Sequence, residues 1–383
     1  MGDSIAVDPD FYTMEEEAYQ DDFNSETTSI ASTIAKGVHL VDGNRYQAMK
    51  ENDYWSPSDE QQFESLENGH MVCLVLDYHQ KNPLHRSPIK ENPKHILDIG
   101  TGKGSWAIDM ADSYPSGNFY ALCPILMFYP RHKHSNQYSN CSRCGYLPSP
   151  VTWMPPNCIF EVDDVLREWT WREPFDLIHL RILLGAFDDA GWDTLYRRCY
   201  DNLEVGGWIE QLEFDIRLYS DDGSLKEDSL LARWGDNFIA CGKRAGRSLT
   251  TQETMKAAIE KAGFVDVHEH LYRLPLGPWA KNEVLKEAGR INYHHWSAGL
   301  EGYAMWLLTK FGAPEPWTTD EVHVYLASIR KELADSKTHA YQYVRRVWGR
   351  KPTEKETKAM EAEVKVKQEE KADSLEPKIK QEE

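Results

Sequence analysis

The segment HILDIGTGKGSWAID, residues 95–109, restricts the fold of this chain more than any other. Its apolar start reads as a buried strand, and Gly100, Gly102 and Gly104 form a turn directly before a helical pattern. Glycine lets a ligand approach bare backbone, and the amides of the next helix's first turn attract an anionic group. The segment therefore predicts a strand, turn and helix that together bind a carboxylate or a phosphate.

Two well-known phosphate-binding turns do not fit this spacing. A P-loop requires Ser or Thr after its lysine, whereas Lys103 is followed by Gly104. A dinucleotide-binding turn requires its third glycine one position later, where this chain has Ser105. A turn that serves only the close packing of strand against helix remains the structural alternative.

The rest of the core alternates short apolar runs with amphipathic helical patterns. Runs such as NFYAL, CIFEVD, FDLIHL and GGWIEQLEF have the length of strands and are mostly apolar. This pattern is typical of a parallel sheet that helices cover on both faces. We therefore predict an α/β fold with a doubly wound, Rossmann-like sheet. A helical block over residues 281–336, which we interpret as a lid, precedes a final strand in HAYQYVRRVWGRKP.

Both ends of the chain differ in composition from this core. Residues 1–35 are acidic and rich in Ser and Thr, and residues 353–383 mix Lys and Glu with almost no large apolar side chains. Such segments bury too little apolar surface to offset the entropy that they would lose on ordering. We predict that both are disordered and that residues 36–352 form one domain.

Composition also disfavours several partners and compartments. The formal net charge is −19, so we expect no direct binding to nucleic acid. No stretch approaches the roughly 20 apolar residues of a membrane span, and the first residues lack the pattern of a targeting signal. Seven cysteines, an odd number that is mostly scattered through apolar segments, indicate reduced thiols and hence the nucleus or cytoplasm.

With Asp98 the turn reads D-x-G-x-G-x-G, which resembles motif I of class I S-adenosylmethionine-dependent methyltransferases. The resemblance implies S-adenosyl-L-methionine as the cofactor. In that family the acidic residue and the turn bind the methionine end of the cofactor. The corresponding residues here are Asp98, Gly100, Thr101, Gly102 and Gly104.

The motifs that follow resemble the same family in order. FEVDDVLREWTW is similar to the third-strand motif, which implies that Asp163, Asp164 and the amide of Val165 bind the adenine, with Asp164 accepting from its amino group. The two aspartates could instead cap the next helix. FDLIHLR and YDNLEVGGWIEQLEFD resemble the next two strand motifs.

Over residues 45–352 the chain resembles a narrower group, the fungal LaeA/UMTA methyltransferases. The strings ILDIGTGKGSWAIDMADSYPS, FDLIHLRILLGAF and HAYQYVRRVWGRKP carry this resemblance. It implies a seven-stranded class I methyltransferase fold and a role in secondary metabolism or its regulation. It also implies a small-molecule or protein methyl acceptor, with regulatory proteins as further partners.

The chain departs from the family in one region. Ala121 stands where the family has an acidic residue that binds both ribose hydroxyls, and residues 126–150 have no counterpart. That insertion contains two histidines and two cysteines of the kind that bind zinc, His132, His134, Cys141 and Cys144. Their spacing is unlike common zinc modules, so we predict no metal site. The insertion is either a genuine loop or an error in the gene model.

Methyl transfer from a sulfonium depends mainly on alignment and desolvation. A base that accepts a proton from a hydroxyl or amine acceptor would assist, and His179 and Glu213 lie near the ends of the predicted fourth and fifth strands. His179 could equally be a buried histidine with a satisfied hydrogen bond. Two functions therefore remain: a methyltransferase with an oxygen or nitrogen acceptor, or a weak or inactive nuclear regulator that uses the fold to bind partners.

Overall fold

The computed structural model describes residues 4–9, 11, 38–41, 44–47, 60–124 and 155–373. A short antiparallel hairpin, β1 (Val38–Val41) and β2 (Asn44–Gln47), precedes the main sheet. The unusual segment 126–150 lies outside the described residues. Among the helices that the structure describes, none is long and apolar enough to cross a bilayer.

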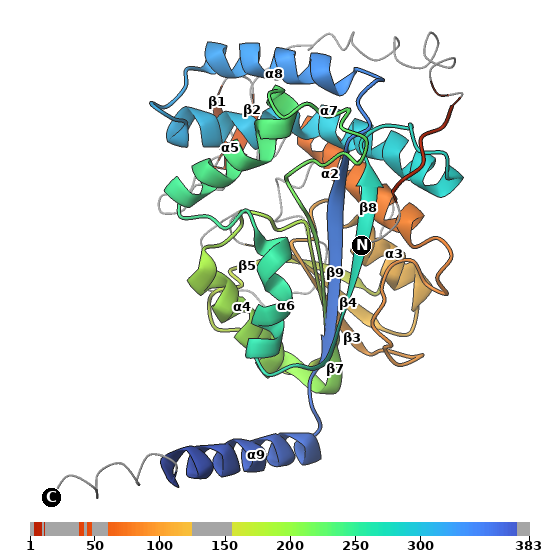
Figure 1. Cartoon of the computed structure of the whole chain (residues 1–383). Coiled ribbons are helices and arrows are strands. Elements are labelled where there is room, and N and C mark those ends of the chain that lie inside the picture. Colours follow the sequence, from red (N-terminus) through yellow and green to blue (C-terminus); the bar gives the residue numbers. More distant parts are fainter. Residues whose placement is uncertain are drawn as a thin grey trace, which may run out of the picture.

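The main sheet has seven strands in the order β5-β4-β3-β6-β7-β9-β8 (Figure 1). Their bounds are β3 (His95–Ile99), β4 (Asn118–Pro124), β5 (Cys158–Asp163), β6 (Phe175–Arg181), β7 (Leu203–Phe214), β8 (Val265–Pro275) and β9 (Tyr341–Arg350). β3 to β7 are parallel, and β9 runs antiparallel to both of its neighbours. The chain order reverses at β3, so the carboxyl ends of β3 and β6 form the switch point where α/β sheets bind ligands. The predicted seven-stranded, doubly wound α/β fold is confirmed.

Helices cover both faces of the sheet because side chains alternate along each strand. On one face, Ile96 of β3 packs in a cluster with Trp106 and Met110 of α3 (Ser105–Ser113). On the other face, Leu97 and Ile99 belong to a cluster that includes residues of α4 (Asp189–Asn202) and α6 (Thr251–Lys261). The near-continuous burial of β6 follows from this double coverage.

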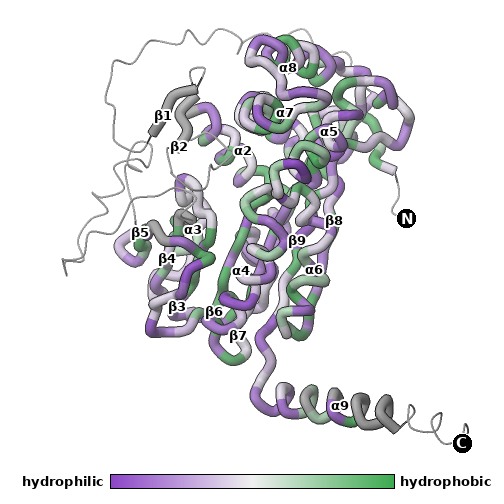
Figure 2. Tube along the Cα trace, turned by 90° about the vertical axis from the view of Figure 1, so that its left-hand side faces the viewer, coloured by the Kyte–Doolittle hydropathy of each residue, from purple (hydrophilic) through white to green (hydrophobic). Residues whose placement is uncertain are grey.

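A second helical layer lies at one end of the sheet, and both ribbon views show it (Figure 1, Figure 2). It consists of α2 (Glu60–Leu76), α5 (Leu230–Arg244), α7 (Glu283–Phe311) and α8 (Thr319–Leu333). α2 and α7 pack closely because Ser65 faces Gly299, whose absent Cβ would lie 2.6 Å from the serine Oγ. Ser65 Oγ also donates to the carbonyl oxygen of His295 at 2.8 Å. The predicted helical block over 281–336 thus contains α7 and α8.

Within residues 1–35, for which we predict disorder, the structure describes residues 4–9 and 11, and several of these contact the body of the protein. Val7 forms a β-bridge with Ala280, and Phe11 is buried in an apolar cluster. Asp8 forms an ion pair with Lys286 of α7. These contacts depend on single side chains within residues 4–11, which composition averaged over 35 residues does not reveal.

Part of residues 353–383, for which we predict disorder, lies in α9 (Glu354–Asp373), which leaves the body at the end opposite α7 (Figure 1). Thr353 and Glu356 exchange hydrogen bonds as a capping box, in which Thr353 N donates to Glu356 Oε2 at 2.7 Å. Arg350 binds the same carboxylate through both Nη atoms, at 3.1 and 2.9 Å. Lys and Glu also have high helix propensity, so this tail needs no core to be helical.

Candidate functional site

The glycine turn joins β3 to α3 at the switch point. Gly100, Gly102 and Gly104 all have positive φ, at 81°, 57° and 88°. A Cβ on Gly100 would lie 2.4 Å from Leu183, and one on Gly104 would lie 2.2 Å from the Phe160 ring. At Gly100 and Gly104, both the positive φ and the closeness of these side chains therefore favour glycine. Gly102 has only Leu66 near its Cβ position, at 3.6 Å, so its φ alone favours glycine.

Helix α2 lies against this turn. Leu66 approaches Gly102, and Glu67 forms an ion pair with Lys103 at 2.6 Å. Thr101 Oγ1 is buried and has no hydrogen-bond partner within the described residues. Buried hydroxyls normally have partners, so this one fits a turn that receives a polar ligand.

Asp98 and His179 are brought together, although 81 positions separate them. Asp98 pairs with His179 in the register of β3 and β6, and its Oδ1 lies 2.8 Å from His179 Nδ1. The imidazole is 2 % exposed and stacks on Trp106 with ring centroids 3.7 Å apart. Burial lowers the pKa of His179 although Asp98 opposes the shift. The neutral ring therefore donates its Nδ1 proton to Asp98 and is enclosed on its other side by Trp106, whose Nε1 donates to Leu84 O.

Glu213 lies apart from this pair, beneath the turn that follows β6. Both of its carboxylate oxygens accept from the amide of Leu183 at 3.1 Å, and Gln211 Nε2 donates to Oε1 at 3.0 Å. Ile182 in the same turn has φ 54°, which is strained for a β-branched residue. Burial raises the pKa of Glu213 to about 7, although these hydrogen bonds oppose the shift.

The acidic motif after β5 forms a local turn. Asp163 ends β5, and Asp164 Oδ1 accepts from the amide of Leu166 at 3.0 Å. Asp164 Oδ2 also lies 3.2 Å from Arg167 Nε, and its side chain is 28 % exposed. Val165 is buried. The motif lies at the carboxyl end of β5, on the same edge of the sheet as the glycine turn.

Ala121 is fully buried on the face that packs against α3. In the sheet it pairs with Asp98 of β3 and with Phe160 of β5, and its methyl group belongs to the cluster that contains Trp106. No carboxylate occupies this position. The residues that follow β4 lie outside the described residues.

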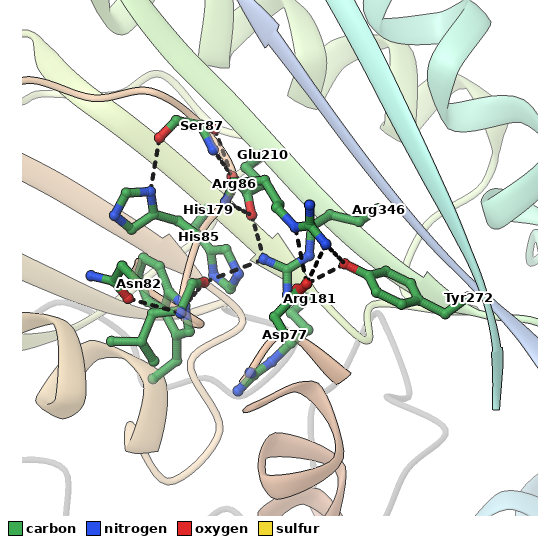
Figure 3. Close-up of polar contacts among 12 residues, drawn as sticks. Asp77, Asn82, His85, Arg86, Ser87, His179, Arg181, Glu210, Tyr272 and Arg346 are labelled. Carbon is green, nitrogen blue, oxygen red and sulfur yellow. Dashed lines mark hydrogen bonds and ion pairs between the residues drawn. The ribbon is translucent and has the colours of Figure 1, made fainter. Parts of the chain in front are cut away.

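A buried ionic network, which sequence reasoning missed, joins α2 to the sheet (Figure 3). Arg346 of β9 is 2 % exposed and binds Glu210 of β7 at 2.7 Å and Asp77 at 3.2 Å. Arg86 Nε donates to Asp77 at 2.9 Å, and Ser87 Oγ donates to Glu210 at 2.6 Å. Burial would raise the pKa of Glu210, but Arg346 and the other partners hold it below its usual value. The pairing of β7 with β9 brings Glu210 close to Arg346, although the two residues are far apart in the sequence.

A surface hollow of about 990 Å³ borders this network without reaching the glycine turn. Its lining comes from residues 80–91 before β3 and from the last part of α3, including Asp109 and Tyr114. None of the glycine-turn residues lines the hollow.

Comparisons with known proteins agree with this arrangement. Residues 70–269 match the family described as "Methyltransferase domain". Methyltransferase pytC of Aspergillus terreus is 31 % identical over 83 % of this chain and 89 % of its own length. Secondary metabolism regulator LAE1 of Cochliobolus heterostrophus is 29 % identical over 82 % of this chain and 95 % of its own length. Protein-methionine methyltransferase laeA of Emericella nidulans is 28 % identical over 82 % of this chain and 76 % of its own length.

Among solved structures, phosphoethanolamine N-methyltransferase 2 of Haemonchus contortus in complex with S-adenosyl-L-methionine is similar to this chain with a TM-score of 0.40. It is 13 % identical over 74 % of this chain and 53 % of that one.

Proposed function

Because the chain belongs to the methyltransferase family that includes pytC and laeA, we propose that it transfers a methyl group from S-adenosylmethionine to an oxygen or nitrogen acceptor in fungal secondary metabolism. The observation that carries the proposal is the glycine turn at the switch point, with its three positive φ angles and the unpartnered Thr101 hydroxyl. The fungal relatives named above support the biological setting.

The residues present fit the cofactor at both of its ends. Asp98, Gly100, Thr101, Gly102 and Gly104 would hold the methionyl end. The segment after β5, with Asp163, Asp164 and Val165, would hold the adenine. When bound, the cofactor supplies a methyl group on a sulfonium, which is already a good leaving group.

In our proposal, His179 and Glu213, which the sequence suggested as bases, position other groups of the site. His179 is enclosed between Asp98 and Trp106, so it orients the Asp98 carboxylate. Glu213 binds the Leu183 amide and so fixes the strained turn after β6, against which Gly100 packs. Rate enhancement then comes from alignment and exclusion of water.

Calorimetric titration with S-adenosylmethionine tests the proposal directly. We expect micromolar binding by the full chain and loss of binding in Gly102→Leu, because a side chain at φ 57° distorts the turn. A Gly246→Leu variant is a matched control: its φ is 67°, nothing lies within 4 Å of its Cβ position, and it follows α5 away from the turn. No binding by the unchanged protein at millimolar ligand would refute a cofactor-dependent function.

A second candidate function is a catalytically weak regulator that uses the fold to bind protein partners. Ala121, which leaves the ribose without its usual carboxylate, favours it, and LAE1 and laeA relatives carry regulatory names or protein substrates. The Gly102→Leu variant separates the two functions in the native host. A regulator would keep its partners and its effect on metabolite production, whereas an enzyme would lose that effect.

A further inference from the structure

Arg181 is the last residue of the motif FDLIHLR, which by itself assigns this charged residue no role. It ends β6, directly after Leu180, which pairs with Ile99 at the end of β3. The next position on β3 is Gly100, so Arg181 stands at the carboxyl edge beside the glycine turn. Alternation along β6 places its side chain on the same face of the sheet as His179 (Figure 3).

The contacts of Arg181 orient its guanidinium but do not neutralise it. Arg181 Nη1 lies 3.0 Å from His70 Nδ1, and His70 Nε2 lies 2.9 Å from Asp109 Oδ2. Burial lowers the pKa of His70, so its ring is neutral near pH 7. The Nε2 proton is then donated to Asp109, and Nδ1 accepts from Arg181. The neighbouring Cys73 thiol is also neutral, because burial raises its pKa.

Arg181 has no counter-ion in the described part of the chain. No carboxylate there lies within 4.0 Å of its guanidinium nitrogens, the limit for an ion pair. Arg346, which is more deeply buried on the same side of the sheet, has two such carboxylates. A partly buried guanidinium without a counter-ion is a site for an anionic group.

We propose that Arg181 binds the carboxylate of the methionyl part of S-adenosylmethionine, and that His70 is the residue that positions its guanidinium. This assignment rests on the proposed function. The carboxylate is the only anionic group of that cofactor, and Arg181 and the unpartnered Thr101 hydroxyl flank the turn expected to receive its methionyl end. A guanidinium can bind both carboxylate oxygens at once.

Calorimetry with two probes tests the assignment: S-adenosylmethionine and its decarboxylated form, which lacks only the carboxylate. We expect the unchanged protein to bind the first about 10- to 100-fold more tightly, the range for a hydrogen bond to a charged group. Arg181→Gln should weaken binding of S-adenosylmethionine by a similar factor and leave binding of the decarboxylated probe nearly unchanged. Arg181→Lys should recover part of the loss, and His70→Leu should weaken only the first probe.

Arg290→Gln is the control. Arg290 is exposed on α7, and Glu287 is its one ion-pair partner among the described residues. It should leave both affinities unchanged, and thermal melting should show that every variant is folded. Equal weakening of both probes by Arg181→Gln, or no weakening of either, would overturn the assignment while leaving the proposed function standing. Failure of the unchanged protein to bind either probe would overturn both.

Discussion

Glu213 should make the stability of this fold depend on pH in a way that one substitution removes. The side chain is fully buried, and burial raises its pKa to about 7 from an ordinary value of 4.5. Between these values the folded protein keeps a proton that the unfolded chain has lost. The stabilisation is therefore complete below about pH 4.5 and is lost as pH rises through about 7. A difference of about 2.5 units corresponds to about 3 kcal/mol of unfolding free energy.

Urea denaturation at pH 5, 6, 7 and 8, with the unchanged protein and Glu213→Gln, measures this dependence. Subtracting one curve from the other cancels the contributions of the other titrating groups. We expect the stability of the unchanged protein, relative to the variant, to fall by about 2–3 kcal/mol over this range. Glu227→Gln, at an exposed position, should leave the pH dependence unchanged. Parallel curves for Glu213→Gln and the unchanged protein would refute the reasoning, because they would mean that Glu213 titrates equally in both states.

Three further substitutions test the packing around the site. In urea denaturation, Gly206→Ala should lower the free energy of unfolding by about 1–2 kcal/mol, and Gly104→Ala should lower it by clearly more. Both glycines have positive φ, but only at Gly104 would the new Cβ lie 2.2 Å from the Phe160 ring. Equal losses would show that the ring moves freely. Arg346→Met should lower the free energy of unfolding by about 3–5 kcal/mol, because it leaves Glu210 buried without its partner. Adding Glu210→Gln should recover part of that loss. Additive losses from the two substitutions would contradict the coupling between them. Ala121→Asp should lower the melting temperature, because it places a buried carboxylate beside Asp98, and an unchanged melt would mean that this position is wetter than its burial indicates.

Local patterns predicted the glycine turn, because its geometry depends only on residues that are adjacent in the sequence. The glycine turn needs only strand, glycines and helix in sequence, and it lies where the spacing placed it. At the ends of the chain, composition averaged over a segment does not reveal single contacts, such as the burial of Phe11 and the capping of α9 by Thr353. The surroundings of Asp98 could not be predicted, because its partner depends on the register of two strands that are far apart in the chain.

The same dependence on strand register explains why the motifs alone did not assign a role to every residue at the site. Asp98 belongs to the motif, and one of its two carboxylate oxygens is bound by His179 of the neighbouring strand. Arg181 ends the motif FDLIHLR, which by itself assigns it no role, yet it stands beside the turn with only neutral partners in the described residues. In our proposal the two positions act on opposite ends of one ligand: Ala121 offers no carboxylate to the ribose, and Arg181, which has no counter-ion among the described residues, offers its guanidinium to the methionyl end. Affinity for such a ligand would then depend more on its methionyl end than on its ribose, so Ala121 alone is weak grounds for treating the chain as inactive.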